Sequence, residues 1–225
     1  LTHAFGIYVR PDEIVNLGID HLKKTDLEYA REKGLKVKLI AQARRINDSV
    51  FAFVAPQFVL DNDSLASVNN EFNAVTLNGE FCDDQLFIGK GAGSLPTGAA
   101  VLSDISALSY DYRYEYKKIY NLGKLPFSNE SLLKVYVSFS KPQDIDLSDF
   151  DSIQDKYFSF DHSYIIGHIC ICRLLEKKWL NNPNNNVVLS QSGIQIHLGN
   201  LCVSTLSTEI EALKKGQVLL EKISV

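Results

Sequence analysis

Residues 71–98 read EFNAVTLNGEFCDDQLFIGKGAGSLPTG, and this stretch sets the expected architecture. Two apolar-rich runs, 71–77 and 80–88, flank the dipeptide Asn78-Gly79. Asn-Gly is a strong hairpin signal because both central residues of a type I′ turn need a positive φ. Asp83-Asp84 in the second run predicts a bulge or a solvated kink. The stretch therefore predicts an antiparallel hairpin.

Glycine is concentrated directly after the hairpin, in 88-IGKGAGSLPTG-98, before a predicted helix that ends near Leu108. Glycine is costly in ordered structure unless the backbone needs a positive φ or must lie close to something. Ser94 is predicted to cap the helix, and Pro96 suits its first turn. Two interpretations stay open: a tight corner, or a helix N-terminus that a polar or anionic ligand can approach.

The glycine pattern fits neither common nucleotide-binding motif. In a Walker loop the lysine follows the last glycine and precedes Ser or Thr, whereas Lys90 comes before most of the glycines. In a dinucleotide fingerprint the third glycine would come later than Gly93, and the motif would open a parallel βαβ unit.

The segments before the hairpin predict a helix and two strands. A capping box, TDLE, starts at Thr25 and predicts a helix that Gly34 ends in the left-handed conformation. Residues 36–44 alternate between apolar and polar and predict a half-buried strand. Residues 49–55 predict a second, more buried strand that ends at Pro56.

A second unit is predicted from Leu132 onward. Its expected elements are a strand over 132–139, a short helix over 149–158, a strand over 163–174 and a closing helix from Thr208 to about Lys222. The whole chain is therefore predicted to be α+β, an antiparallel sheet with helices on one face followed by a small β-α-β-like module. We place the two domains at 1–121 and 132–225.

Composition excludes some classes of function. The chain has 225 residues, a net charge of −4 and a pI of about 5.7, which argues against nucleic-acid binding. No apolar stretch approaches the ~20 residues that span a bilayer, so no membrane partner is expected. Methionine is absent and the chain opens on Leu-Thr-His, which indicates that it is not a complete gene product.

The cysteines predict neither a disulfide framework nor a metal site. Cys82, Cys170, Cys172 and Cys202 show no framework spacing, so a reducing cytoplasm is expected. His168, Cys170 and Cys172 share one face of a predicted strand, but a zinc site needs four ligands and no second cluster completes this one. We predict no metal.

Three segments together resemble the homoserine dehydrogenase family. Residues 89-GKGAGSLPTGAAVLSDI-105 are similar to its Gly-x-Gly-Ala-Gly-x-x-(Pro/Val)-Thr-Ala-x-x-Val-x-x-Asp segment, with Gly98 where the family often has Ala. Residues 65-LASVNNEFNAVTLNGE-80 and 18-GIDHLKKTDLEYAREKGLKVKLIAQARR-45 match two further family stretches in order. The resemblance covers residues 1 to about 108.

The resemblance implies a function and a set of site residues. The family interconverts aspartate 4-semialdehyde and homoserine with NAD or NADP, in threonine and methionine biosynthesis, using a Rossmann domain followed by a substrate and dimerisation domain. It implies that Gly93, with Gly91 and Ala92 as neighbours, borders the cofactor, and that the protein is a homodimer. The catalytic Asp-x-x-x-Lys signature is expected upstream of Leu1, so no catalytic residue is assigned and this chain alone is expected to be inactive.

Many family members end in an ACT regulatory domain, and 132–198 resembles a degenerate version. The segment 139-FSKPQD-144 lacks the Asp-x-Pro-Gly turn that helps to bind an amino-acid effector. Two alternatives to the enzyme stay open at this point: a non-enzymatic dimerisation module, and an effector-binding regulatory module.

Overall fold

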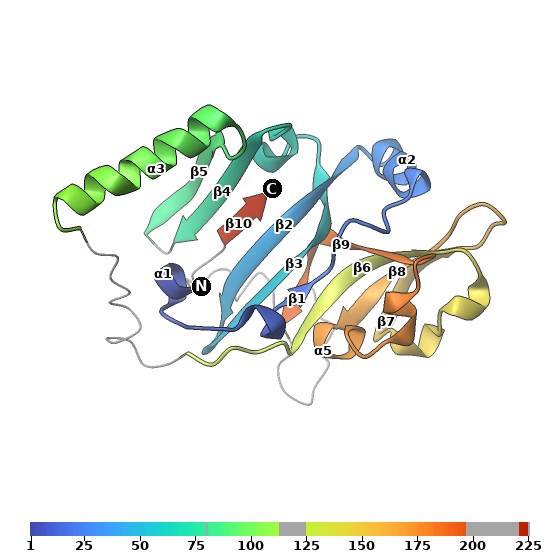
Figure 1. Cartoon of the computed structure of the whole chain (residues 1–225). Helices are drawn as coiled ribbons and strands as arrows, with labels where there is room; N and C mark the ends of the chain where they lie inside the picture. Colours follow the sequence, from blue (N-terminus) through green and yellow to red (C-terminus); the bar gives the residue numbers. More distant parts are fainter. Residues whose placement is uncertain (80, 113–124, 197–220, 225) are drawn as a thin grey trace.

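The computed structural model describes residues 1–79, 81–112, 125–196 and 221–224. Its ten strands form one mixed sheet in the order β5-β4-β10-β2-β3-β9-β6-β8-β7, with β1 also paired to β3. Figure 1 shows the sheet running across the molecule, with α2 and α3 beside it. The predicted α+β class is confirmed.

The first half of the chain builds one part of this sheet. Its strands are β1 (Val15–Asn16), β2 (Leu35–Ile46), β3 (Ser49–Leu60), β4 (Phe72–Gly79) and β5 (Cys82–Lys90). Its helices are α1 (Thr2–Phe5), α2 (Lys24–Glu32) and α3 (Ser94–Ser109). Gly34 follows α2 with a φ of 67°, as its sequence position predicted.

The second half adds β6 (Ser131–Phe139), β7 (Ser152–Tyr157), β8 (Ser163–Cys170) and β9 (Asn186–Ile196), with the short helix α5 (Ile171–Leu174). β6 lies between β8 and β9, and β7 lies outside β8, and each of these pairings is antiparallel. The sheet continues from β9 to β3 through a short parallel pairing, Gln57 with Leu189 and Phe58 with Ser190.

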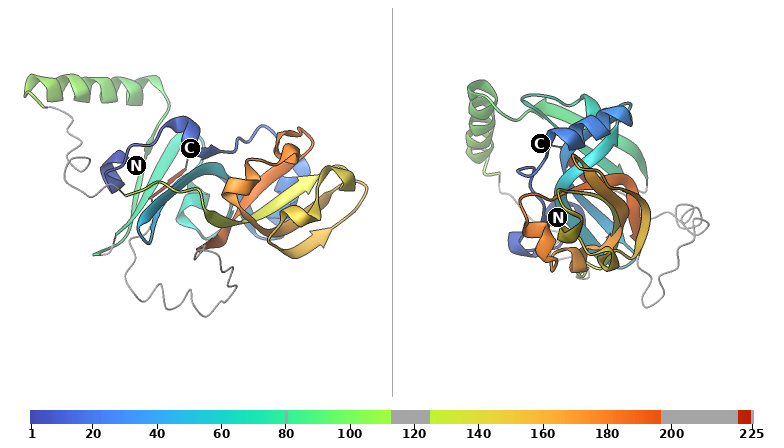
Figure 2. Two further views of the ribbon diagram at one scale, coloured as in Figure 1. Left: turned by 90° about the horizontal axis from the view of Figure 1, so that it is seen from below. Right: turned by 90° about the vertical axis from the view of Figure 1, so that its right-hand side faces the viewer.

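The proposed division into 1–121 and 132–225 stays a prediction, but the two parts share a core. The largest buried cluster combines Phe51 and Phe53 of β3 with Val135 and Val137 of β6. A second cluster on the other side of these strands contains Ala30 of α2. Figure 2 shows the strands of both halves as one twisted layer.

The prediction that Pro56 ends its strand is wrong, because β3 continues to Leu60. The Val54 carbonyl accepts a hydrogen bond from the Leu17 N–H, 2.7 Å away, so residue 54 faces β1. Residues two apart on a strand face the same neighbour, so the Pro56 nitrogen also points to that side. There the pairing with β1 stops at Val54 and the pairing with β9 starts at Gln57. The missing N–H therefore costs no ladder bond.

The hairpin is confirmed, but its turn is not at Asn78-Gly79. Gly79 pairs with Cys82, so the chain reverses between those two residues. The register shifts between Leu77 and Gly79, which sets Asn78 against both Asp83 and Asp84 and confirms the bulge. The Asn78 side-chain amide bonds the Asp84 carboxylate there.

The predicted helix over 149–158 is wrong. Two 3₁₀ turns, Pro142–Asp144 and Leu147–Asp149, precede the strand β7 instead. β7 pairs closely with β8 at Gly167, where a Cβ would lie 2.5 Å from the Ser152 carbonyl oxygen. Pairing with a neighbouring strand thus overrides the local helical pattern.

The predicted closing helix falls largely outside the described residues. Its last two residues, Glu221 and Lys222, lie in the strand β10 (Glu221–Ser224), where the helix prediction is wrong. β10 is hydrogen-bonded to both β2 and β4. The backbone groups along the edges of β2 and β4 can hydrogen-bond a strand between them, but they could not pair with a helix.

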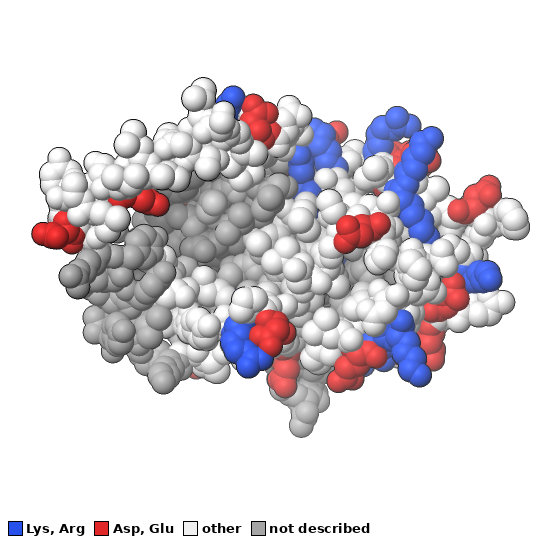
Figure 3. All heavy atoms as spheres, viewed as in Figure 1, with Lys and Arg blue, Asp and Glu red and all other residues white. Residues whose placement is uncertain are grey.

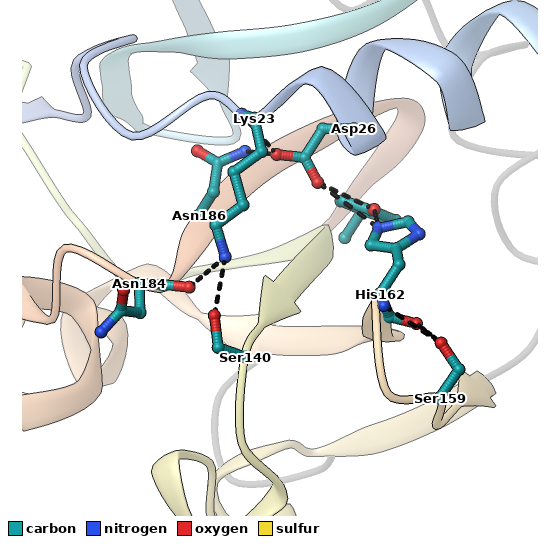
Figure 4. A network of polar contacts seen from close by, with 8 residues as sticks. Lys23, Asp26, Ser140, Ser159, His162, Asn184 and Asn186 are labelled. Carbon is teal, nitrogen blue, oxygen red and sulfur yellow. Dashed lines mark hydrogen bonds and ion pairs between the residues drawn. The ribbon is translucent and has the colours of Figure 1, made fainter.

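The cap of α2 differs from the predicted one and creates a buried polar network. Lys23, rather than Thr25, precedes the helix, and its N–H donates to Oδ2 of Asp26 over 3.0 Å. The Asp26 side chain has no solvent exposure. Its Oδ2 also accepts from the Asn186 side-chain amide at 3.0 Å, and its Oδ1 accepts from the Tyr136 hydroxyl at 3.0 Å (Figure 4).

His162 completes this network. Its Nε2 lies 2.7 Å from the Tyr136 oxygen and 3.6 Å from Asp26 Oδ1. A phenol has one proton, which Tyr136 gives to the carboxylate, so His162 must donate from Nε2. One carboxylate therefore joins α2 to β6, to β9 and to the segment before β8.

Aromatic rings pack beside this network. Tyr29 of α2 stacks on Tyr136 with 4.8 Å between ring centroids and lies 5.0 Å from the ring of Tyr164. Burial raises the pKa of the Tyr29 hydroxyl to about 12, with further contributions from Tyr164 and Asp155. Burial, followed by the charge of Asp26, also raises the pKa of Tyr136.

We expect Asp26→Asn to lower the free energy of unfolding by about 2–3 kcal/mol, because an amide group would face donors that now meet a carboxylate. Urea denaturation followed by circular dichroism measures the change. The matched control is Asp146→Asn, which alters an exposed carboxylate that also accepts from a backbone N–H, that of Ser148 at 2.9 Å. The control should cost under about 1 kcal/mol. Equal losses in the two variants would contradict a structural role for the network.

We expect the protein to lose stability between about pH 10 and pH 12. Tyr29 titrates at 10.0 when unperturbed and at about 12 in the fold, so in this window only the unfolded chain loses the proton. Unfolding is then favoured as the pH rises, and the contribution of Tyr29 is complete below pH 10.

Urea midpoints measured from pH 9 to 12 test this titration. The decrease in urea midpoint as the pH rises should be smaller in Tyr29→Phe than in the unmodified protein. Tyr110→Phe is the control, because the Tyr110 side chain is exposed, and it should leave the fall unchanged. A Tyr29→Phe profile that matches the unmodified one would exclude this cause.

Candidate functional site: the glycine corner at the start of α3

The glycine-rich segment forms the corner between β5 and α3, and Gly91 lies where the strand ends. The Gly91 N–H donates to the Glu71 carbonyl over 2.9 Å, which continues the β4–β5 pairing by one residue. A Cβ on Gly91 would overlap the side-chain amide of Asn73. A residue with a Cβ at this position would therefore require the Asn73 side chain to move.

Gly93 turns the chain into the helix. Its φ of 123° and ψ of 154° lie in a region that residues with a Cβ rarely adopt. It is also the N-cap, and its carbonyl accepts from the Thr97 N–H over 3.1 Å. Ser94 is thus the first helical residue and not the predicted cap, and Pro96 lies in the first turn as predicted.

Gly89 and Gly98 have no such requirement within the described part of the chain. No described atom lies within 4 Å of a Cβ built on either residue, and neither has a positive φ. Ala92, between Gly91 and Gly93, is exposed. The corner thus offers bare backbone whose outer side is open.

Charge around the corner is balanced by one ion pair. Lys90 Nζ lies 3.0 Å from a Glu71 carboxylate oxygen and 5.4 Å from the ring centroid of Phe72. A backbone hydrogen bond and the Lys90 ammonium together hold the pKa of the Glu71 carboxyl below its usual value. Lys90 and Glu71 lie at neighbouring ends of the hairpin, so their ion pair joins the two chain segments beside the corner.

The first turn of α3 is chemically suited to an anionic group. The N–H groups of Ser94 and Leu95 belong to the helix start, where no intrahelical acceptor exists. The first turn carries no acidic side chain, and a helix N-terminus has a partial positive charge. The corner therefore fits the polar or anionic ligand that the sequence suggested, and it also meets the requirements of a tight corner.

The rest of α3 is apolar and uncovered in the described structure. Figure 3 shows a mostly uncharged surface along the helix. The exposed apolar side chains are those of Leu95, Val101, Leu102, Ile105 and Leu108. A helix of this composition is normally buried against another element.

The other predicted candidates lie elsewhere. His168 is buried, with Nδ1 2.9 Å from the Ser152 hydroxyl, and Cys170 and Cys172 form a disulfide with Cα atoms 5.4 Å apart. That bridge was not expected from the cysteine spacing. Among the described residues no group of three or more His, Cys, Asp and Glu could hold a metal, and no helix could cross a membrane.

Sequence reasoning missed the contributions of Glu71 and Asn73 to the corner. Both come from the opposite strand of the hairpin, at positions that depend on its register. The chain reverses after Gly79 and a bulge shifts the register by one further residue, so an Asn78-Gly79 turn would have set the wrong partners.

Known proteins are similar in sequence to the first part of the chain. Residues 1–106 match the family model described as homoserine dehydrogenase. The homoserine dehydrogenase of Lactococcus lactis is 39% identical over 102 residues, which is 45% of this chain and 24% of that protein. That of Bacillus subtilis is 34% identical over 110 residues, 49% of this chain and 25% of that protein. These matches span about a quarter of the curated relatives.

Solved structures extend the likeness in fold beyond residue 106. A homoserine dehydrogenase from Thiobacillus denitrificans covers 84% of this chain, with a TM-score of 0.62 and 21% sequence identity, over 50% of its own length. One from Staphylococcus aureus covers the same share with a TM-score of 0.51 and 23% identity, over 49% of its length. At these identities the likeness concerns the fold alone. Residues 1–106 of this chain therefore match the homoserine dehydrogenase family in sequence, and the chain is similar in fold to solved homoserine dehydrogenases.

Proposed function

We propose that the protein containing this chain is an NAD- or NADP-dependent homoserine dehydrogenase that interconverts aspartate 4-semialdehyde and homoserine. The observation that carries the proposal is the glycine corner, which lies inside the matched segment and has a backbone conformation only glycine adopts readily. The family pattern and the local geometry therefore favour the same residues.

In this proposal Gly93, Gly91 and Ala92 border the cofactor. The bound nicotinamide would accept a hydride from the carbinol carbon of homoserine. This chain would contribute the open backbone at the corner and the N–H groups of Ser94 and Leu95, which can bind a polar or anionic part of the dinucleotide. A Cβ at Gly93 would strain the turn and lie 3.3 Å from Cδ of Pro96, so a larger side chain would disturb the start of the helix.

The groups that transfer the proton are proposed to lie in sequence outside these 225 residues. General acid–base catalysis needs a side chain within hydrogen-bond reach of the substrate oxygen. The Asp-x-x-x-Lys spacing occurs in residues 1–225 at Asp20 and Lys24, but these residues belong to the segment 18–45, which resembles a different family stretch, so we propose that the catalytic pair lies elsewhere. The exposed apolar surface of α3 supports the presence of further protein that covers this helix.

We further propose a cytoplasmic homodimer that acts in threonine and methionine biosynthesis. The alternative, a non-enzymatic dimerisation module, would use the same sheet and leave the glycines as a simple corner. Both alternatives predict a stable fold, so activity measurements have to separate them.

We expect Gly93→Val in the full-length enzyme to raise the KM for the nicotinamide cofactor about tenfold or more, equivalent to about 1.4 kcal/mol of lost binding. Initial rates of homoserine-dependent nicotinamide reduction, measured with NADP and then with NAD, give the constants. The KM for homoserine should change less, because the side chain is added on the cofactor side.

Gly98→Ala is the matched control for this change. It lies in the same segment, meets no described atom, and should raise the free energy of unfolding by about 0.5–1 kcal/mol through better helix propensity. Its cofactor KM should stay unchanged. If Gly93→Val lowers thermal stability while its cofactor KM is normal, the glycines form only a corner and the cofactor proposal fails.

The isolated 225-residue chain is expected to show no homoserine-dependent reduction of NAD or NADP, because the catalytic pair is proposed to lie outside it. The measurement is nicotinamide absorbance with chain that circular dichroism shows to be folded. Turnover above the rate of a homoserine-free control would contradict the placement of the catalytic pair outside residues 1–225.

A further inference from the structure

β5 forms one open edge of the ten-stranded sheet. In the described part of the chain it pairs with β4 alone, and its outer side has no strand beside it. Three consecutive apolar residues on this edge are exposed: Leu86 by 40%, Phe87 by 55% and Ile88 by 52%. An open, apolar edge strand is a template for pairing with another chain.

The β4–β5 register identifies the backbone groups that this edge presents. Because the Gly91 N–H faces β4, the alternation of a strand makes the polar groups of Gly89 and Phe87 face β4 as well. The N–H and C=O groups of Leu86, Ile88 and Lys90 then point outward. These are the groups that a further strand could bond.

A second copy of this chain can satisfy these groups in one favourable register. A two-fold axis perpendicular to the sheet keeps each side chain on the same face of the joined sheet. In such a pair, one residue lies directly opposite the same residue of the second copy, and the axis runs between the two. We name the axis by that residue. With the axis at Phe87, Leu86 meets Ile88 of the second copy as a hydrogen-bonded pair. Asp84, which lies in the bulge and bonds Asn78, is opposite Lys90 of the second copy. Apolar residues then face apolar residues, and opposite charges meet at both ends.

Neighbouring registers are worse. An axis at Leu86 sets Ile88 against Asp84 of the second copy, and an axis at Ile88 sets Leu86 against Lys90. Lys90 already contacts Glu71, but an ammonium has three donors and can bond a second carboxylate.

The opposite edge of the sheet does not offer such a match. β7 is exposed along its whole length, but an axis at Asp155 or at Lys156 makes like charges face each other. An axis at Gln154 sets Ile153 against Asp155 of the second copy. The charges of β7 therefore oppose self-pairing, whereas those of β5 favour it.

We propose that two copies of this protein pair antiparallel along β5, with the two-fold axis at Phe87, so that two sheets join into one. This inference rests on the proposed homodimer and specifies its contact. The occupant is a second copy because this strand is self-complementary in both charge and apolar pattern.

Cysteine cross-linking of the full-length protein tests the register. In Phe87→Cys, the two sulfurs would face each other across a non-hydrogen-bonded pair with Cα atoms about 4.5 Å apart, which suits a disulfide. Glutathione disulfide would take the two electrons and two protons, and a covalent dimer should form on non-reducing gels. Gln85→Cys is the matched control on the same strand face, opposite Gly89 of the second copy, and should remain at the level of the unmodified protein.

Light scattering of the unmodified protein separates this inference from the broader proposals. A dimeric mass with selective cross-linking through Phe87→Cys supports it. A dimeric mass without that cross-link, or with equal cross-linking through Gln85→Cys, overturns the β5 register and leaves the dimer standing. A monomeric mass overturns both the β5 contact and the homodimer. The proposed enzymatic activity is tested separately, by homoserine-dependent reduction of the nicotinamide.

A second variant covers the case in which the cysteine disturbs the strand. Phe87→Glu sets two carboxylates against each other on the axis and should convert the dimer to a monomer of unchanged circular dichroism spectrum. A folded Phe87→Glu variant that remains dimeric overturns the proposed contact.

Discussion

The buried carboxylate of Asp26 is the interaction on which the arrangement of the two halves depends. Within the sheet, β3 and β9 are joined by two residue pairs only. Asp26 adds bonds from α2 to Tyr136 and Asn186, and the aromatic rings around Tyr29 close the same side. A desolvated charge persists only when hydrogen bonds replace its water, so the network permits one placement of α2.

The opposite side of the same strands is held by apolar packing. Phe51 and Phe53 of β3 meet Val135 and Val137 of β6 in the largest buried cluster. The junction therefore has an apolar side, which supplies burial energy, and a polar side, which restricts geometry. This combination gives a continuous sheet that reaches from the glycine corner to β7.

That continuous sheet positions the candidate site at one end of the molecule. The corner is held by the β4–β5 register, by the close contact of Gly91 with Asn73 and by the conformation of Gly93. None of these features requires a ligand, although together they leave the start of α3 open. The same strand whose C-terminal end forms the corner presents its free edge to a second copy in our inference. The cofactor contact and the dimer contact would then share β5.

Local sequence was sufficient for several features. Asn78-Gly79 with its alternating flanks predicted the hairpin, Gly34 marked the end of α2, and the glycine segment identified the strand-to-helix corner. These signals are local because each depends on the φ values and side-chain alternation of neighbouring residues. The geometry of Gly93 is compatible with both a cofactor contact and a simple corner. The family motif is what favours the cofactor contact.

Only the tertiary structure decided those features that depend on partners distant in sequence. Pro56 lies inside a strand because the pairing of β1 and β9 leaves a gap beside it. Residues 152–157 form a strand because Gly167 admits a close neighbour, and Asp26 replaces the predicted cap because Tyr136 and Asn186 complete its bonds. The sequence by itself determined the hairpin, the glycine corner and the resemblance of residues 1–106 to the homoserine dehydrogenase family. Strand ends, caps and register required the fold, because long-range hydrogen bonds outweigh local preferences that differ by about 1 kcal/mol.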